Sequence, residues 1–360
     1  MLKYLLIFVP IAFVLEYMHA APTLVFLASA LAIVPLAGWL GHATEELAAH
    51  FGAAIGGLLN ATFGNATELI IAFFALLAGQ AEVVKASLIG SIIGNVLLVL
   101  GLAAFMGGRR YARLAYNVEN VKVLSSMMII AMIGFIVPTV FDFNERILLS
   151  ESPAHALIID ADLALGVAIV LIILYVGNLI FSLITHKDVL STSDEEADAH
   201  SASWSIPKAV GILLAVTVLI AFMSEFLVGA LEGFTEALGL SAGFVGLILI
   251  PIIGNAAEHS SAITFAMKNK MDLAVTIAIG SAIQIALLVG PLLVLLSWLV
   301  NKRMDLVLRG PLELVALIGS VLIANSVARD GETHWYEGLM LLGVYVILAI
   351  AFFFAPSGAA

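Results

Sequence analysis

Long apolar runs follow one another along this chain with only short polar breaks between them. A helix that spans a bilayer needs about 20 apolar residues, and a backbone inside lipid must satisfy its own hydrogen bonds, which favours helices. The expected spans are 3–18, 22–41, 51–78, 82–107, 122–141, 160–185, 207–227, 243–268, 271–300, 311–327 and 335–355. The chain is therefore predicted to be an all-α polytopic membrane protein with about 11 transmembrane helices.

The composition excludes several classes of function. Of the 360 residues, 62% are hydrophobic and only 11% are charged, which leaves no room for a sizeable domain outside the membrane. A net charge of −11 argues against nucleic acid as a partner, and the absence of cysteine removes disulfides and thiolate metal sites. The sequence contains no HExxH or Walker-type motif, and its single GxSxG match, at residues 239–243, lies at the start of the predicted span 243–268 rather than after a strand, so it does not indicate a nucleophile elbow. We therefore expect a protein that is not an enzyme and that needs no cofactor.

Basic residues in short loops predict the orientation. Arg109, Arg110, Arg113 and Lys122 follow the fourth span, which places that loop in the cytoplasm. A second basic loop, with Lys302, Arg303 and Arg309, would then face outward. The short tails suit a prokaryotic plasma (inner) membrane. Residues 1–20 are expected to form a leading transmembrane helix, although a cleaved signal peptide also fits this segment.

Residues 187–206 are the least membrane-like part of the chain. Asp194, Glu195, Glu196 and Asp198 lie close together in this segment. It is predicted to be a cytoplasmic acidic linker. Two interpretations stay open, a solvated connection or a short helix that gathers cations.

The linker separates two halves that share a motif. Residues 64–68 read GNATE and residues 254–258 read GNAAE, at an offset of 190 residues (258 − 68). At the same offset, the pair Gly-Ser recurs at 90–91 and 280–281. Because an odd number of spans separates the copies, they must cross the bilayer in opposite directions. We expect two inverted-topology five-helix repeats, residues 21–186 and 207–360, with a substrate site near the midplane where they meet.

Glu68 and Glu258 are the strongest candidates for a functional site. An ionisable side chain at bilayer depth costs about 2.5–3.5 kcal/mol even on the lenient insertion scale. These two glutamates occupy equivalent positions of the repeat, each in a run that glycine can interrupt. They are therefore expected to approach each other from opposite sides.

Uncharged oxygen donors accompany the two glutamates. Carboxylate, amide and hydroxyl oxygens suit a hard cation such as Ca²⁺, and the same ligand types suit Mn²⁺. The alternative is that these side chains only form hydrogen bonds between helices. The candidates are Asn65, Asn255, Gln284, Ser91, Asn95 and Ser281.

Three further residues are candidates for a proton path or for supporting the site. His259 directly follows Glu258, and its side chain points about 100° away from it on a helix. Glu45 and Glu225 lie near the ends of the second and seventh spans, where they are equally well explained as interfacial charges.

Two neighbouring carboxylates suggest a mechanism of exchange. With Ca²⁺ bound, both can be ionised, whereas two like charges in an empty buried site would repel each other and take up protons. Cation and protons would compete for the same oxygens. Alternating access would then produce antiport.

Both motifs, each followed by Gly-Ser and then by Asn95 or Gln284, resemble the repeat motifs of the calcium/proton (cation/proton) antiporters of the calcium–cation antiporter superfamily. The resemblance covers essentially the whole chain. It implies that Glu68 and Glu258 carry cation and protons, that Asn65, Asn255 and Gln284 assist, and that residues 194–198 correspond to the family's acidic helix. The expected partners are Ca²⁺, H⁺ and the lipid bilayer, and a homo-oligomer is compatible with the sequence.

Two alternatives to proton exchange stay open. One is a Na⁺-coupled Ca²⁺ exchanger, a branch that resembles this one but carries a further oxygen ligand where this chain has Ile285. The other is a passive cation channel, since paired carboxylates also select cations.

Overall fold

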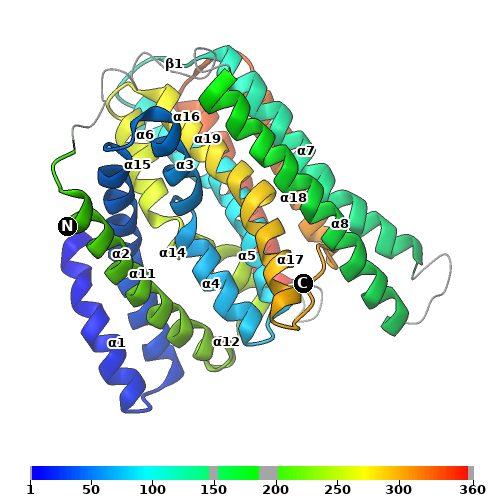
Figure 1. The fold of residues 1–360 in the computed structure, drawn as a ribbon. Coiled ribbons are helices and arrows are strands. Elements are labelled where there is room, and N and C mark those ends of the chain that lie inside the picture. The colour runs from blue at the N-terminus through cyan, green and yellow to red at the C-terminus, as the bar shows by residue number, and fades with distance from the viewer. Residues whose placement is uncertain (1, 146–152, 186–201, 356–360) are drawn as a thin grey trace.

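The structure is a computed structural model that describes residues 2–145, 153–185 and 202–355. It is 84% helical (Figure 1), which confirms the predicted all-α class. The α-helices are α1 (Phe8–Tyr17), α2 (Pro22–Ala48), α3 (Gly52–Phe63), α4 (Ala66–Leu77), α5 (Ala81–Ile93), α6 (Leu100–Gly108), α7 (Val118–Phe143), α8 (Pro153–Ile180), α11 (Ile206–Gly229), α12 (Leu231–Leu238), α13 (Ala242–Phe244), α14 (Ile250–Gly254), α15 (Ala256–Ala266), α16 (Met271–Gln284), α17 (Gly290–Leu299), α18 (Pro311–Val327) and α19 (Trp335–Phe354). The acidic cluster 194–198 lies outside the described residues.

Short helical turns of other pitch join several of these helices. A 3₁₀ segment, η1 (Leu2–Ile7), precedes α1. The π-helical segments with bounds in the described part of the chain are η2 (Gly94–Val99), η4 (Phe181–Thr185), η5 (Val245–Leu249) and η6 (Ile285–Val289). As a result α5, η2 and α6 form one long helix, and α16, η6 and α17 form its counterpart in the second half.

Within the described residues, eight helices are long and apolar enough to cross a membrane. A ninth span is present if α12 and the helix Ala242–Gly254, which meet at 114°, count as one broken crossing. The predicted number of 11 is not confirmed, because Tyr4–Tyr17 and Pro311–Val327 form apolar helices shorter than 18 residues. The chain is nevertheless a multi-pass membrane protein.

A small β-ribbon marks one end of the bundle. The strands β1 (Leu114–Ala115) and β2 (Glu332–Thr333) pair antiparallel, which joins the loop after α6 to the turn before α19. Arg110 also donates to the carbonyl of Met267 just after α15, at 3.3 Å. These contacts hold together the loop after α6, the turn before α19 and the turn after α15. They lie at the end of the bundle at which β1 is labelled in Figure 1. We call it the inner end, since its basic loop is predicted to be cytoplasmic, and the opposite end the outer end.

The helices that carry the repeated motifs form the centre of the bundle. In Figure 1, α4, α5 and α14 lie in the middle, with α1, α2 and α11 on one side and α7, α8 and α18 on the other. Val84, Ile89, Ile93 and Leu97 on the α5–η2 helix are at most 1% exposed, so this helix is surrounded by protein. Outward-facing Ile173 on α8 is 63% exposed, as expected for a lipid-facing surface.

The two halves approach each other most closely at Gly90. A Cβ atom on Gly90 would stand 2.0 Å from the carbonyl oxygen of Leu247 on η5, so only glycine allows this contact. Gly246 on η5 makes a similar close contact with α5, because a Cβ atom on Gly246 would stand 2.9 Å from the Cβ of Ala86. Small residues let helix backbones pack closely inside a membrane.

The substitution Gly90→Ala is expected to destabilise the protein, because a methyl group there would collide with backbone. Overpacking typically costs about 1–3 kcal/mol, and a clash with backbone belongs at the upper end. Gly280→Ala is the matched control, since Gly280 occupies the equivalent repeat position and has nothing within 4 Å of its Cβ position. Thermal unfolding in detergent measures both variants. An equal change in Tm for the two would contradict the close approach at Gly90.

Candidate functional site

Two helices break at the repeated motifs. Between α3 and α4 the backbone leaves helical geometry at Asn65 (φ −102°, ψ 24°), and between α14 and α15 it does so at Asn255 (φ −89°, ψ 14°). Glycine precedes each asparagine and weakens the helix at that point. A new helix starts directly after each break, with Glu68 or Glu258 in its first turn. Helix N-termini stabilise negative charge, so both carboxylates lie where the helix dipole favours ionised oxygen.

The side chain of Asn65, at the break between α3 and α4, forms hydrogen bonds with the other half of the protein. Its amide nitrogen donates to the Oε1 atom of Gln284. Its Oδ1 accepts from the hydroxyl of Ser281 at 2.8 Å. All of these bonds cross from the first repeat to the second.

Asn255 repeats this arrangement in the opposite direction. Its amide nitrogen donates to the hydroxyl of Ser91 at 3.1 Å and to the carbonyl of Pro251 at 2.9 Å. Its Oδ1 accepts from the amide of Asn95 at 3.2 Å. Asn95 also donates to Ser281 at 3.3 Å, and so connects the two sets of bonds. The structure thus brings these six polar side chains together in one hydrogen-bond network.

The π-helical segments place two of these side chains. Asn95 is the second residue of η2, and Gln284 is the residue before η6, at nearly equivalent repeat positions. A π-helical turn is wide, and such turns frequently occur at functional sites. Ile285 takes the position equivalent to Asn95 and is fully buried, so the two halves differ here in chemistry.

The Glu68 carboxylate is buried beside the opposite break. Its Oε1 lies 3.3 Å from the position that a Cβ would take on Gly254. Both of its carboxylate oxygens are buried and have no hydrogen-bond partner among the described residues. A cavity of about 10 Å³, lined by Glu68, Ser87 and Ser91 among others, adjoins it and has about the space of one water molecule.

Glu258 is partly exposed, and its Oε2 is buried without a partner in the described part of the chain. The two glutamates are close enough for the charge on Glu258 to act on Glu68. Asn95 Oδ1 is also buried and unpartnered among the described residues. The site therefore presents several oxygen lone pairs that the described protein atoms leave unused.

A larger cavity of about 430 Å³ reaches this region from the inner end. Its wall includes Asn120 at the start of α7, Ser182 on η4, and Gln284. Asn60, also in the wall, is exposed. The polar network is therefore approached from the inner side by a cavity far larger than the one beside Glu68.

The remaining candidates lie apart from the hydrogen-bond network. Glu45 is exposed near the end of α2, 3.8 Å from His42, and Glu225 is exposed on α11. His259 is partly buried beside Glu258. Within the described residues, no group of three or more His, Cys, Asp and Glu side chains forms a metal-binding cluster, so a cation here would depend on amide and hydroxyl oxygens as well.

Sequence reasoning missed Glu46, the neighbour of Glu45. Glu46 is fully buried and accepts hydrogen bonds from the backbone N–H groups of Ser203 and Trp204, both at 2.8 Å. It therefore fixes the end of the acidic linker to the inner end of α2. The sequence carries no signal that separates Glu46 from its neighbour Glu45, because the fold determines which face of α2 is buried.

The match to known proteins covers nearly the whole chain. The family model described as sodium/calcium exchanger protein matches residues 21–184 and 208–354. A protein named Ca(2+)/H(+) antiporter from Aphanothece halophytica is 46% identical over 98% of this chain and 96% of its own length. The Ca(2+)/H(+) antiporter ChaA of Bacillus subtilis is 42% identical over 96% of each chain.

Solved structures show the same fold. Native YfkE superposes with a TM-score of 0.84 at 39% identity, over 99% of this chain and 100% of that one. The H+/Ca2+ exchanger CAX superposes with a TM-score of 0.71 at 17% identity, over 98% of this chain and 91% of that one, which concerns the fold alone. The resemblance inferred from the two motifs is thus confirmed. The chain belongs to the family of sodium/calcium exchanger proteins and is related within it to the calcium/proton antiporters.

Proposed function

We propose that this protein exchanges Ca²⁺ for H⁺ across a membrane by alternating access, with Glu68 and Glu258 as the shared binding groups. The observation that carries the proposal is the pair of broken helices, each of which presents a glutamate with buried, unpartnered oxygen to the same region. The names of the relatives at 46% and 42% identity support the choice of ions. Bacterial relatives such as the one from Bacillus subtilis support a prokaryotic plasma membrane as the location.

The oxygen set favours Ca²⁺ as the cargo, and it also suits Mn²⁺. Ca²⁺ accepts six to eight oxygen ligands in flexible geometry, whereas Mg²⁺ holds its waters more firmly. Among the described residues, Glu68, Glu258 and Asn95 have oxygens without partners. We propose that these bind the cation first, together with water from the inner cavity, while Asn65, Asn255, Ser91 and Ser281 hold the two breaks in place.

Charge balance supplies the coupling to protons. Two ionised carboxylates compensate a bound Ca²⁺, but in the empty site they repel each other in a poorly solvated environment. Protonation relieves this repulsion and removes the cation's ligands at the same time. The exchange of one Ca²⁺ for two H⁺ would leave the net charge of the site unchanged. We propose this stoichiometry, with His259 as a candidate for the proton path.

The two cavities support alternating access. The inner cavity of about 430 Å³ extends to Gln284, while the space beside Glu68 is only about 10 Å³. The protein is thus in an inward-facing state under this proposal. The domain boundaries fit as well, because the family model matches each predicted half separately and leaves out residues 185–207. We propose that these halves rock against each other, as inverted repeats do in other transporters.

Removal of either carboxylate should stop exchange. Glu68→Gln and Glu258→Gln keep the side-chain size but remove the negative charge, so Ca²⁺ uptake into proteoliposomes is expected to fall to the level of protein-free vesicles. Glu236→Gln, which changes an exposed glutamate on α12, is the control and should transport normally. Gel filtration shows whether each variant is folded. Normal transport by a folded Glu68→Gln or Glu258→Gln protein would refute the paired-glutamate site.

The driving ion separates this proposal from a sodium-coupled exchanger and from a channel. Isotopic Ca²⁺ uptake into proteoliposomes should follow an imposed pH gradient and should not respond to an imposed Na⁺ gradient. The buried Ile285, which offers no oxygen where Asn95 has its amide in the other half, is the reason to expect no Na⁺ coupling. Uptake driven by Na⁺ alone would favour the sodium-coupled alternative. Ca²⁺ flux that neither saturates nor depends on a counter-ion would favour a channel.

A further inference from the structure

The loop between α17 and α18 is irregular in backbone but buried. Met304, Leu306 and Val307 are at most 1% exposed, although none of them belongs to a helix. Irregular backbone at the end of a membrane bundle is tolerated only where its polar groups find partners within the protein. Residues 301–310 are therefore a packed and integral part of the outer end of the bundle.

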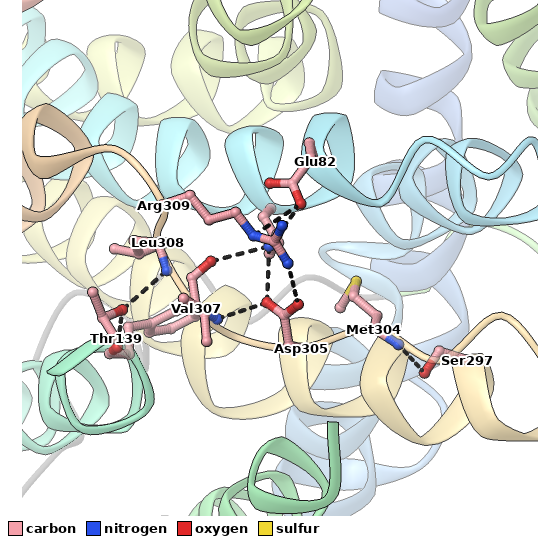
Figure 2. A network of polar contacts seen from close by, with 10 residues as sticks. Glu82, Thr139, Ser297, Met304, Asp305, Val307, Leu308 and Arg309 are labelled. Atoms are coloured by element: carbon pink, nitrogen blue, oxygen red, sulfur yellow. Dashed lines mark hydrogen bonds and ion pairs between the residues drawn. The ribbon is translucent and has the colours of Figure 1, made fainter. Parts of the chain in front are cut away.

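Side chains from neighbouring helices accept hydrogen bonds from the backbone N–H groups of this loop (Figure 2). The N–H of Met304 donates to Ser297 on α17 at 3.1 Å. The N–H of Leu308 donates to Thr139 on α7 at 3.0 Å. The loop thus connects the outer ends of two helices.

A cluster of ionised side chains holds the same loop against α5. The ammonium of Lys85, which is 4% exposed, donates to Asp305 Oδ1 at 2.8 Å and to the carbonyl of Val307 at 3.0 Å. Lys85 also pairs with Glu82 at 3.1 Å. Arg309 pairs with Asp305 at 3.0 Å and with Glu82 at 3.4 Å. Figure 2 draws these contacts as dashed lines around the Arg309 side chain. We call Glu82, Lys85, Asp305 and Arg309 the outer ion-pair cluster.

The central pair of the cluster, Lys85 and Asp305, is a strong constraint because both side chains are buried, whereas Glu82 and Arg309 are exposed. Burial opposes ionisation of Asp305, yet Lys85 and Arg309 together hold its pKa below its usual range, so the Asp305 carboxylate stays ionised at neutral pH. The charge on Lys85 also acts on Glu313 at the start of α18. Loss of one partner from a buried ion pair leaves a costly unpaired charge.

The position of the cluster connects it with the candidate site. Lys85 lies in the first turns of α5, the helix whose Ser87 and Ser91 line the small cavity beside Glu68. The 301–310 loop is thus fastened over the outer end of the helix that borders this cavity. Movement of the outer end of α5 away from the loop would have to break the cluster.

The inner end has an equivalent loop with different chemistry. At the repeat offset of 190 residues, Glu82 corresponds to Asp272, which accepts the N–H of Asn117, and Asn120 donates to Thr276 at 3.1 Å nearby. Lys85 corresponds to Val275. A buried ammonium group therefore occurs at only one of the two equivalent positions. This is the outer end, where the cavity is small.

We propose that the outer ion-pair cluster is a latch that holds the outer side of the transporter closed, with Lys85 as its central positioning residue. The proposal rests on the alternating access proposed above. In the inward-facing state the latch joins α5 to the 301–310 loop, which is bonded in turn to Thr139 on α7. The latch must open before Glu68 can be reached from outside, and its stability sets how often this happens.

Two single-cysteine reporters test this directly, because the natural chain contains no cysteine. Ser87→Cys reports on the outer side, and Gly280→Cys, in the wall of the inner cavity with nothing within 4 Å of its Cβ position, reports on the inner side. Each is labelled with a membrane-impermeant maleimide applied from its own side of proteoliposomes of defined orientation. Lys85→Met or Asp305→Asn is then added to each reporter.

The latch predicts reciprocal changes. Without it, the labelling rate of Ser87→Cys from outside should rise several-fold, and that of Gly280→Cys from inside should fall. The double variant Lys85→Asp with Asp305→Lys restores an ion pair and should bring both rates back toward their original values. The control is Lys122→Met, which breaks the exposed pair between Lys122 and Glu119 and should change neither rate.

Other outcomes would overturn the latch. An increase at both reporters would mean that the cluster only stabilises the fold, and unchanged rates would mean that it does not control access. If Lys85→Met does not fold, Asp305→Asn, which keeps the size of the side chain, carries the test alone. Labelling does not depend on the transported ion. Reciprocal labelling together with a failure of Ca²⁺/H⁺ exchange would therefore refute the proposed ions and leave the latch standing.

Discussion

Two helices are broken in the middle of this protein, and side chains from the opposite half close each break. A broken helix inside a bilayer exposes backbone polar groups that lipid cannot satisfy. Here Asn65 bonds to Ser281 and Gln284, while Asn255 bonds to Ser91 and Asn95. Neither half by itself supplies all the hydrogen-bond partners of the asparagine at its break. The candidate site thus exists only because the two halves meet, and any movement between them must act on these bonds.

This dependence gives the polar residues two kinds of role. The asparagines at the breaks use their amide groups to bind the opposite repeat, which leaves little capacity for direct contact with a cation. The glutamates one turn later retain unpartnered oxygens at helix N-termini. Under the proposed function, amides that hold the breaks surround carboxylates that bind the cation, although both kinds of side chain offer oxygen ligands.

The central part of this arrangement could be predicted from the sequence, because it depends on local and repeated signals. The Gly-Asn pairs marked the breaks, the offset of 190 residues marked the inverted halves, and an ionisable residue within an apolar run is conspicuous. The partner of each amide could not be predicted, since it depends on helix packing. The same limit applies to Lys85, whose partner Asp305 lies 220 residues away (305 − 85) in a loop that appeared to be merely basic. Glu45 and Glu46 differ only in which face of α2 they occupy, and the fold decides which of them is buried.

The unequal ends of the molecule have a thermodynamic consequence. Inverted repeats suggest a transporter that could work equally well from either side, but Lys85 corresponds to Val275, and Asn95 to Ile285. Under the proposed alternating access, a cation that arrives from outside binds only to the fraction of molecules that face outward, and its apparent dissociation constant rises as that fraction falls. If the outer ion-pair cluster keeps this fraction small, one site of fixed intrinsic affinity would half-saturate at a lower Ca²⁺ concentration on the cytoplasmic side. The protein would then be suited to collect a scarce ion inside the cell and to release it into a medium where that ion is abundant.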